Sequence, residues 1–167
     1  MGAKEYLEFD FDQRNIPEPY ALAVGRVSLC WTQTEHIIED VIAGLARLPG
    51  KRGWAITSHM NFPMKCDALL SLSELALDEQ DHEALRLVVG RLKILSEARN
   101  RYVHSYWAVH EDTGDVYVTA IKARGKLKAD YSKVMLDDVT AAAASIYQVG
   151  IDLLAFIIHR GLLPVEG

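Results

Sequence analysis

Apolar residues recur at the spacing of α-helices over most of the chain. From residue 20 to about residue 48 they return every three or four positions, and Pro49-Gly50 ends the predicted helix. A polar loop over residues 51–58 separates this helix from a second one, which begins near Asn61 and has Pro63 in its first turn. Each helix carries an apolar face, so we expect both to pack against other elements.

The third helical pattern follows the polar break 78–81, whose side chains suit helix capping, and extends from about residue 81 to residue 105. The period then changes, because residues 106–110 and 116–123 alternate or are β-branched and aromatic. Turn-forming residues fill the segment 111–115 between them. The two segments therefore predict a β-hairpin.

The remaining segments complete the outline. Residues 126–134 either continue the hairpin as a third short strand or form a loop. A last helix begins near Leu136 and ends at about residue 160, with Gly161 as its stop signal. This helix is apolar almost all round, which predicts that it is buried in a bundle or at a subunit contact. Residues 1–19 are acidic and aromatic and are expected to form an extended or poorly ordered arm.

Together these elements predict a mainly α protein. We expect a four-helix bundle with a small β-hairpin inserted between the third and fourth helices. A length of 167 residues favours one domain with a sizeable core. The predicted boundaries are an N-terminal arm over residues 1–19 and a helical domain over residues 20–167, with the hairpin at about residues 106–128.

Composition narrows the class of protein. The formal charge of −5 argues against a nucleic-acid binder that works by overall charge alone, so any RNA contact must come from a local patch. Cys30 and Cys66 lie in apolar helical patterns, which favours free thiols in a reducing cytosol over a disulfide. Because no stretch approaches about 18 uninterrupted apolar residues, we expect no membrane span and a cytoplasmic protein.

The richest chemistry lies in the sequence Arg99-Asn100-Arg101-Tyr102-Val103-His104, near the end of the third helical pattern. Arginine holds a phosphate with two hydrogen bonds and stays charged at any working pH. Asparagine donates and accepts hydrogen bonds without titrating, and histidine takes or gives a proton near neutral pH. These groups suit phosphodiester chemistry.

This segment resembles the Arg-x(4–6)-His motif of the HEPN superfamily, in its Arg-Asn-x-x-x-His form. HEPN domains are small helical bundles with the motif near the end of the third main helix, and the position matches here. The resemblance implies metal-independent RNA cleavage without a cofactor, in which the ribose 2′-OH attacks the adjacent phosphate. It implies that His104 is the general base or acid, that Arg99 holds the phosphate and that Asn100 orients the phosphate or His104. It also implies a homodimer whose two motifs face each other.

A finer resemblance concerns Tyr106. The HEPN branch that pairs with minimal nucleotidyltransferase antitoxins carries Arg-x4-His-x-Tyr, and His104-Ser105-Tyr106 matches it. In that branch the tyrosine accepts AMP from the antitoxin, which makes Tyr106 a candidate regulatory site and an antitoxin a candidate partner. The chain departs from this branch because Tyr106 opens a predicted strand and a hairpin is present.

Helical geometry places a constraint on the motif. Arg99 and His104 are five residues apart, which is about 140° around a helix, so they are not expected to share one face. Asn100 and His104 are four apart and do share one. Arg99 would therefore have to reach round on its long stem, or act on a phosphate held between two copies of the motif.

Two weaker patterns complete the set of candidate residues. If the segment from Lys122 to Lys128 is one strand, its basic side chains form a stripe that could follow RNA, with Arg101 nearby; a solvated edge strand is the blander interpretation. The stripe contains Lys122, Arg124, Lys126 and Lys128.

Glu35 and Glu39 lie four apart beside a histidine, which fits a polar helix face better than a metal site. One of these two acids could instead orient Arg99 or His104.

Three functional hypotheses follow. The first is a metal-independent endoribonuclease centred on Arg99, Asn100 and His104, in a toxin–antitoxin or defence system. The second is a non-catalytic HEPN-like module that binds a nucleotide, RNA or a protein partner. The third is a helical scaffold in which His104 only caps a helix and Arg99 only pairs with a surface acid.

Overall fold

The computed structural model describes residues 8–123 and 127–164. It is mainly helical, with five α-helices and a small antiparallel sheet among the described residues. Packing divides the chain into two compact units where the sequence predicted one domain. The sheet unit comprises Met1–Leu29 and Ser96–Ala144, and the helical unit comprises Cys30–Leu95 and Ser145–Gly167. Three of the helices contribute residues to both units, which is why hydrophobic periodicity alone gave no boundary inside them.

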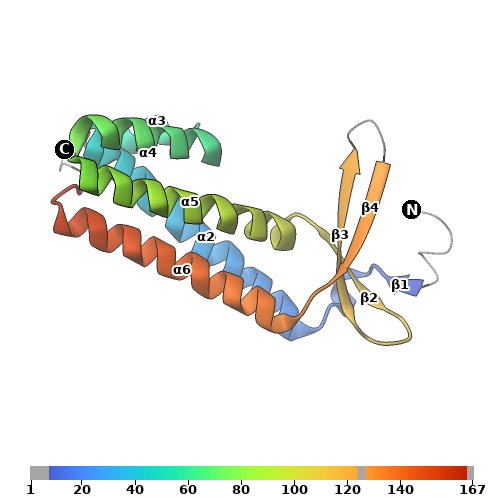
Figure 1. The fold of residues 1–167 in the computed structure, drawn as a ribbon. Helices are drawn as coiled ribbons and strands as arrows, with labels where there is room; N and C mark the ends of the chain where they lie inside the picture. The colour runs from blue at the N-terminus through green and yellow to red at the C-terminus, as the bar shows by residue number, and fades with distance from the viewer. Residues whose placement is uncertain (1–7, 124–126, 165–167) are drawn as a thin grey trace. The chain divides into compact units, whose positions relative to one another are not determined.

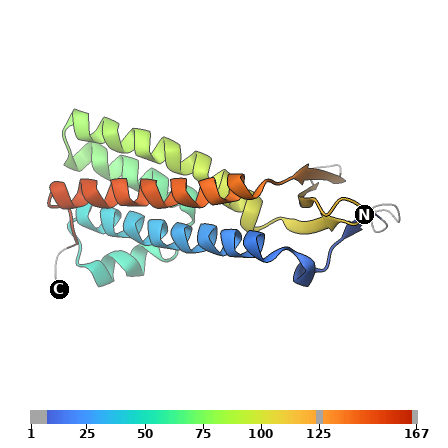
Figure 2. The ribbon, with the colours of Figure 1, turned by 90° about the horizontal axis from the view of Figure 1, so that it is seen from below.

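Four helices supply the hydrophobic core of the helical unit, and they correspond to the four that the periodicity predicts. They are α2 (Glu18–Leu45), α4 (Phe62–Ala76), α5 (Glu79–Val103) and α6 (Leu136–His159), and Figure 2 shows them side by side. Burial of this shared face removes apolar surface from water and drives the packing. The core includes Ile38 and Val41 of α2, Leu69 of α4, Leu92 of α5 and Leu153 of α6.

The expected polar loop over residues 51–58 is wrong, because this segment forms a fifth helix, α3 (Gly50–Thr57). Gly53 lies so close to α2 that a side chain there would stand 2.4 Å from the Cβ atom of Ala43. Thr57 is fully buried, and Trp54 donates a hydrogen bond of 3.0 Å to Asp40 Oδ1. Tertiary packing thus stabilises a helix that the sequence pattern does not predict.

The capping residues that the sequence predicts are found at the helix ends. The Asn61 side chain accepts a hydrogen bond from the Met64 amide at the start of α4, and Pro63 lies in the first turn. Asp78 Oδ1 accepts a bond of 2.9 Å from the Asp81 amide at the start of α5. Gly161 follows α6 with a φ of +61°, a conformation that a glycine adopts without steric cost.

Helix α6 is long and apolar enough to cross a membrane by length and composition, although the sequence criterion predicted no span. The core helix of a soluble protein meets the same criterion, so this is weak evidence. Inside the helical unit Val149, Leu153 and Ile157 of α6 belong to the core, whereas Tyr147 and Ile158 are exposed. The helix is thus buried along one stripe, not all round.

The sheet unit contains four antiparallel strands in the order β1-β2-β3-β4 (Figure 1). The predicted hairpin is present as β2 (Tyr106–His110) and β3 (Val116–Ala123), with Gly114 at a φ of +70° in the turn between them. The segment left open as strand or loop forms β4 (Leu127–Lys133), which pairs with β3.

The described part of the expected N-terminal arm is extended at Phe9 and Asp10, and the sheet orders it. Phe9 and Asp10 form strand β1 (Phe9–Asp10), which pairs with His110 and Val109 of β2. The short helix η1 (Gln13–Asn15) follows and is capped by the side chain of Asp12. Backbone pairing to a strand about 100 residues away orders this segment, and such a long-range contact leaves no local signal.

The sheet unit has its own buried face. Trp107 of β2 and Val118 of β3 are directly opposite each other and both are buried. The Tyr20 ring of α2 lies 6.2 Å from the Trp107 ring, and its hydroxyl donates to the Val134 carbonyl at 3.2 Å. Val27 of α2 is also fully buried in this unit.

Candidate functional site

Helix α5 ends at Val103, two residues before the predicted end, and His104 and Ser105 form a bend before β2. The His104 amide still donates to the Asn100 carbonyl at 3.1 Å, which closes the last helical turn. Beyond this bond the chain leaves helical geometry. The His104 side chain is therefore released from the angular spacing that a continuous helix would impose.

The side chains of Arg99, Asn100 and His104 meet in this bend. Arg99 Nη1 donates to Asn100 Oδ1 at 2.9 Å and lies 2.6 Å from His104 Nε2. Of the two alternatives, Arg99 thus reaches His104 within one chain, on its long stem. Because the guanidinium has only donors, this contact is a hydrogen bond when His104 Nε2 accepts.

The three side chains are open to solvent to different degrees. Asn100 and His104 are exposed and Arg99 is half-buried. Arg101 is exposed too, and its guanidinium carbon lies 5.8 Å from the centre of the Tyr102 ring. A phosphate could therefore approach a fixed cation, an amide and an imidazole at one place on the surface.

Buried neighbours fix the chain on both sides of His104. Tyr102 is buried, and Trp107 Nε1 donates to the Tyr102 carbonyl at 2.8 Å. Gln13 Nε2 in turn donates to the Trp107 carbonyl at 2.8 Å. Sequence analysis missed Gln13 as a supporting residue, because it lies 94 residues from Trp107 in the chain. Burial raises the pKa of the Tyr102 hydroxyl, which indicates packing and not proton transfer.

Tyr106, the candidate AMP acceptor, is the first residue of β2 as predicted. Its side chain is 64% exposed, so its hydroxyl is accessible to a large partner. Tyr106 follows His104 by only two residues, and both belong to the sheet unit.

The basic residues between Lys122 and Lys128 do not form a stripe along one strand. Strand β3 ends at Ala123 and β4 begins at Leu127, so the segment turns back on itself. Lys122 is paired in register with Lys128 across the two strands. Arg124 and Lys126 lie outside the described residues.

Glu35 and Glu39 contact a lysine instead of supporting the motif. Lys65 Nζ lies 2.7 Å from Glu39 Oε1 and 3.5 Å from Glu35 Oε1, and both Lys65 and Glu39 are buried. His36 Nδ1 lies 3.2 Å from Glu39 Oε2. In the part of the chain that the structure describes, no group of three or more His, Cys, Asp or Glu side chains is placed to hold a metal ion. The cluster is a buried ion pair between α2 and α4.

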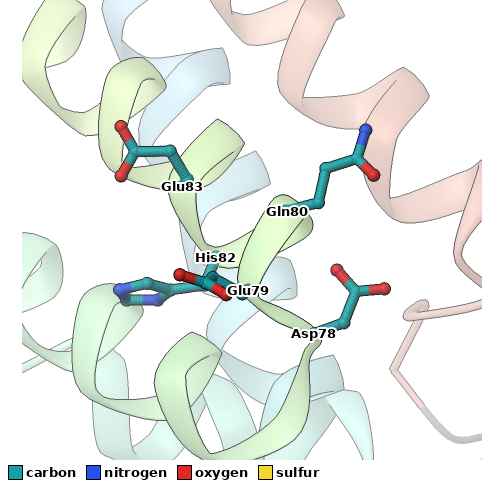
Figure 3. A pocket seen from close by; sticks show the side chains of 5 residues that line it. All are labelled: Asp78, Glu79, Gln80, His82 and Glu83. Atoms are coloured by element: carbon teal, nitrogen blue, oxygen red, sulfur yellow. The ribbon is translucent and has the colours of Figure 1, made fainter.

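An open acidic pocket lies at the start of α5 in the helical unit, lined by Asp78, Glu79, Gln80, His82 and Glu83 (Figure 3). His82 Nδ1 lies 2.8 Å from Ser73 Oγ. The Ser73 hydroxyl donates its proton to the Leu70 carbonyl at 2.9 Å, so it accepts from His82 and is not activated as a nucleophile. This pocket offers no catalytic pair.

Comparison of the chain with protein-family models, with curated proteins and with solved structures found no match. The function must therefore be inferred from the chemistry of the residues themselves.

Proposed function

We propose that the protein is a metal-independent endoribonuclease of HEPN type, with Arg99, Asn100 and His104 as its catalytic centre. One observation carries the proposal: the guanidinium of Arg99 contacts both the amide oxygen of Asn100 and the ring nitrogen of His104. The three side chains of the motif thus meet at one place on the surface, although Arg99 and His104 are five positions apart.

The proposed reaction starts when a phosphate of RNA displaces His104 from Arg99. The guanidinium then donates to the non-bridging phosphate oxygens and stabilises the charge that develops on them. His104 Nε2 is free to take the proton of the neighbouring ribose 2′-OH. The O2′–P bond forms, the P–O5′ bond breaks, and O5′ takes a proton from a general acid. The products are a 2′,3′-cyclic phosphate and a 5′-hydroxyl.

We propose a second copy of the chain as the source of that general acid. In the HEPN arrangement two motifs face each other, so a protonated His104 of the partner copy would lie on the leaving-group side. A two-fold axis beside the end of α5 would create this geometry, because it places identical residues opposite one another.

Regulation through Tyr106 belongs to the same proposal. In the toxin branch that the motif resembles, AMP is attached at this position, and Tyr106 is sufficiently exposed to accept it. An adenylate two residues from His104 would add a negative charge and occupy the approach of a substrate phosphate. A nucleotidyltransferase antitoxin would be the partner, and the protein would act in a toxin–antitoxin or defence system.

The test is cleavage of a mixed-sequence RNA in EDTA by the native chain and by His104→Ala. Loss of a general acid or base should reduce the rate by about 100-fold or more. His159→Ala changes another exposed histidine, outside the motif and in the helical unit, and should leave the rate unchanged. Equal rates for the native chain and His104→Ala, with both folded, would refute the assignment.

The second candidate is a binding module without turnover. It is favoured by the contact of Arg99 with His104 Nε2, which occupies the lone pair that a general base needs. In that case the native chain binds RNA or a nucleotide in EDTA but leaves it intact, and Arg99→Ala weakens binding.

A further inference from the structure

One face of the four-stranded sheet is lined with aromatic rings. Residues paired directly across antiparallel strands point to the same face, and so do residues two apart in one strand. Phe9 pairs with His110, Ala108 with Tyr117, and Thr119 with both Tyr106 and Tyr131. This register places five rings from all four strands on one face, which we call the aromatic face: Phe9, Tyr106, His110, Tyr117 and Tyr131.

Four of these rings form a layer. The Phe9 ring stacks on the Tyr131 ring at 4.9 Å and meets the Tyr117 and His110 rings at 5.2 Å. Phe9 and Tyr131 belong to the outermost strands, which a flat sheet would hold about 14 Å apart at its strand spacing. The sheet therefore curves toward this face. All four rings remain partly exposed, so the layer has an outer surface that solvent reaches.

The fifth ring, Tyr106, extends this surface toward the catalytic motif. Its side chain is 64% exposed, whereas Thr119, directly opposite it in register, is 2% exposed. Thr119 Oγ1 has no hydrogen-bond partner within the described residues.

Two arginines lie at the end of the helix that precedes Tyr106. Arg99 and Arg101 lie at the end of α5 in the same unit. Phosphate groups bind such local concentrations of positive charge.

We propose that the aromatic face binds unpaired RNA bases by stacking. This inference rests on the proposed ribonuclease function for the identity of the ligand. Every base has a π-face, so stacking on Tyr106 and the adjoining ring layer tolerates any sequence. The first stacked base places a phosphate at Arg99 and His104. A duplex keeps its bases stacked inside and does not offer them.

The experiment measures binding apart from cleavage. A fluorescein-labelled RNA of mixed sequence is titrated in EDTA with the His104→Ala chain, both as a single strand and annealed to its complement. The single strand should bind more tightly. Tyr106→Leu should weaken single-strand binding by about 5-fold or more, since one base–aromatic stack contributes about 1–3 kcal/mol, whereas Tyr106→Trp should retain it.

The matched control is Tyr147→Leu, which removes an exposed tyrosine from α6 in the other unit and should leave binding unchanged. Equal affinity for single strand and duplex would overturn the inference. So would a folded Tyr106→Leu chain, checked by thermal unfolding, that binds the single strand as tightly as its parent.

Cleavage by the chain with native His104 separates this inference from the proposed function. If that chain cleaves RNA, and Tyr106→Leu leaves KM for a single strand unchanged, the nuclease assignment survives and the aromatic platform is refuted. If single-strand binding depends on Tyr106 while the native chain never cleaves, the platform survives and the nuclease is refuted.

Discussion

At the residue scale, the end of α5 at Val103 decides what His104 can reach. A helix continued to residue 105 would hold Arg99 and His104 about 140° apart. The bend at His104 removes this restriction and lets Arg99 Nη1 lie 2.6 Å from His104 Nε2. The sequence identifies the residue types and their order. It does not give the contact, because a shift of two residues in a helix boundary lies within ordinary error.

The geometry of Arg99 leads to a prediction for Arg99→Lys. Lysine keeps the charge but lacks the planar fork that contacts Asn100 and His104 and grips a phosphate with two bonds. We expect kcat/KM for RNA to fall by about 10-fold or more, because an interaction that strengthens in the transition state is lost. Steady-state cleavage in EDTA measures this loss.

Arg101→Lys is the matched control for that substitution, since Arg101 is exposed and makes no described contact with His104. It should change kcat/KM less than two-fold. Equal losses for Arg99→Lys and Arg101→Lys would show that the loss does not depend on the contacts of Arg99 with Asn100 and His104, and no loss for either would show that charge alone suffices.

At the element scale, the sequence predicts the helices that have an apolar face and capping residues. It does not predict the elements that depend on contacts with residues far away in the chain. Helix α6 begins at Leu136 as its capping signal predicts. Helix α3 depends on the contact of Gly53 with α2, and β1 depends on pairing with β2. Neither contact leaves a periodic signal in its own segment, which explains why the α3 segment was expected to be a loop and the β1 segment an extended or poorly ordered arm.

The Lys65–Glu39 ion pair is a second contact that joins two elements, α2 and α4. Lys65→Met should destabilise the chain by about 3–5 kcal/mol, because it leaves the Glu39 carboxylate buried without its cation. The double variant Lys65→Met/Glu39→Leu should recover most of this loss, since no buried charge remains. Urea unfolding measures the free energies.

An exposed pair in the same unit provides the comparison. Arg91 Nη1 lies 3.1 Å from Asp152 Oδ2, and both side chains are substantially exposed. Arg91→Ala should therefore change the free energy of unfolding by only about 0.5 kcal/mol. If Lys65→Met cost no more than Arg91→Ala, the ion pair between α2 and α4 would not stabilise the fold as described.

At the scale of the whole molecule, the proposed catalytic and RNA-binding residues lie together in the sheet unit. Arg99, His104 and the aromatic face all belong to it, and the helical unit supplies a separate core. Sequence analysis found the motif but not this division, because α2, α5 and α6 continue through both units without a break in their hydrophobic pattern.

A requirement for two copies of the chain is testable by dilution. If each reaction uses two histidines from two copies, activity per chain should stay constant at high concentration and fall once the dimer dissociates. Mass photometry on the same dilution series reports the dimer fraction. Full activity per chain in a solution of monomers would show that one motif suffices.

The most direct measurement of the central claim uses a DNA strand that contains a single ribonucleotide, incubated with the native chain in EDTA. The proposed mechanism needs the 2′-OH as its nucleophile, so cleavage should occur only at the phosphate that follows the ribonucleotide. The ends, identified by mass spectrometry, should be a 2′,3′-cyclic phosphate and a 5′-hydroxyl, and His104→Ala should give neither. Cleavage of the all-DNA strand, a 5′-phosphate product, or an intact strand with the native chain would contradict the account.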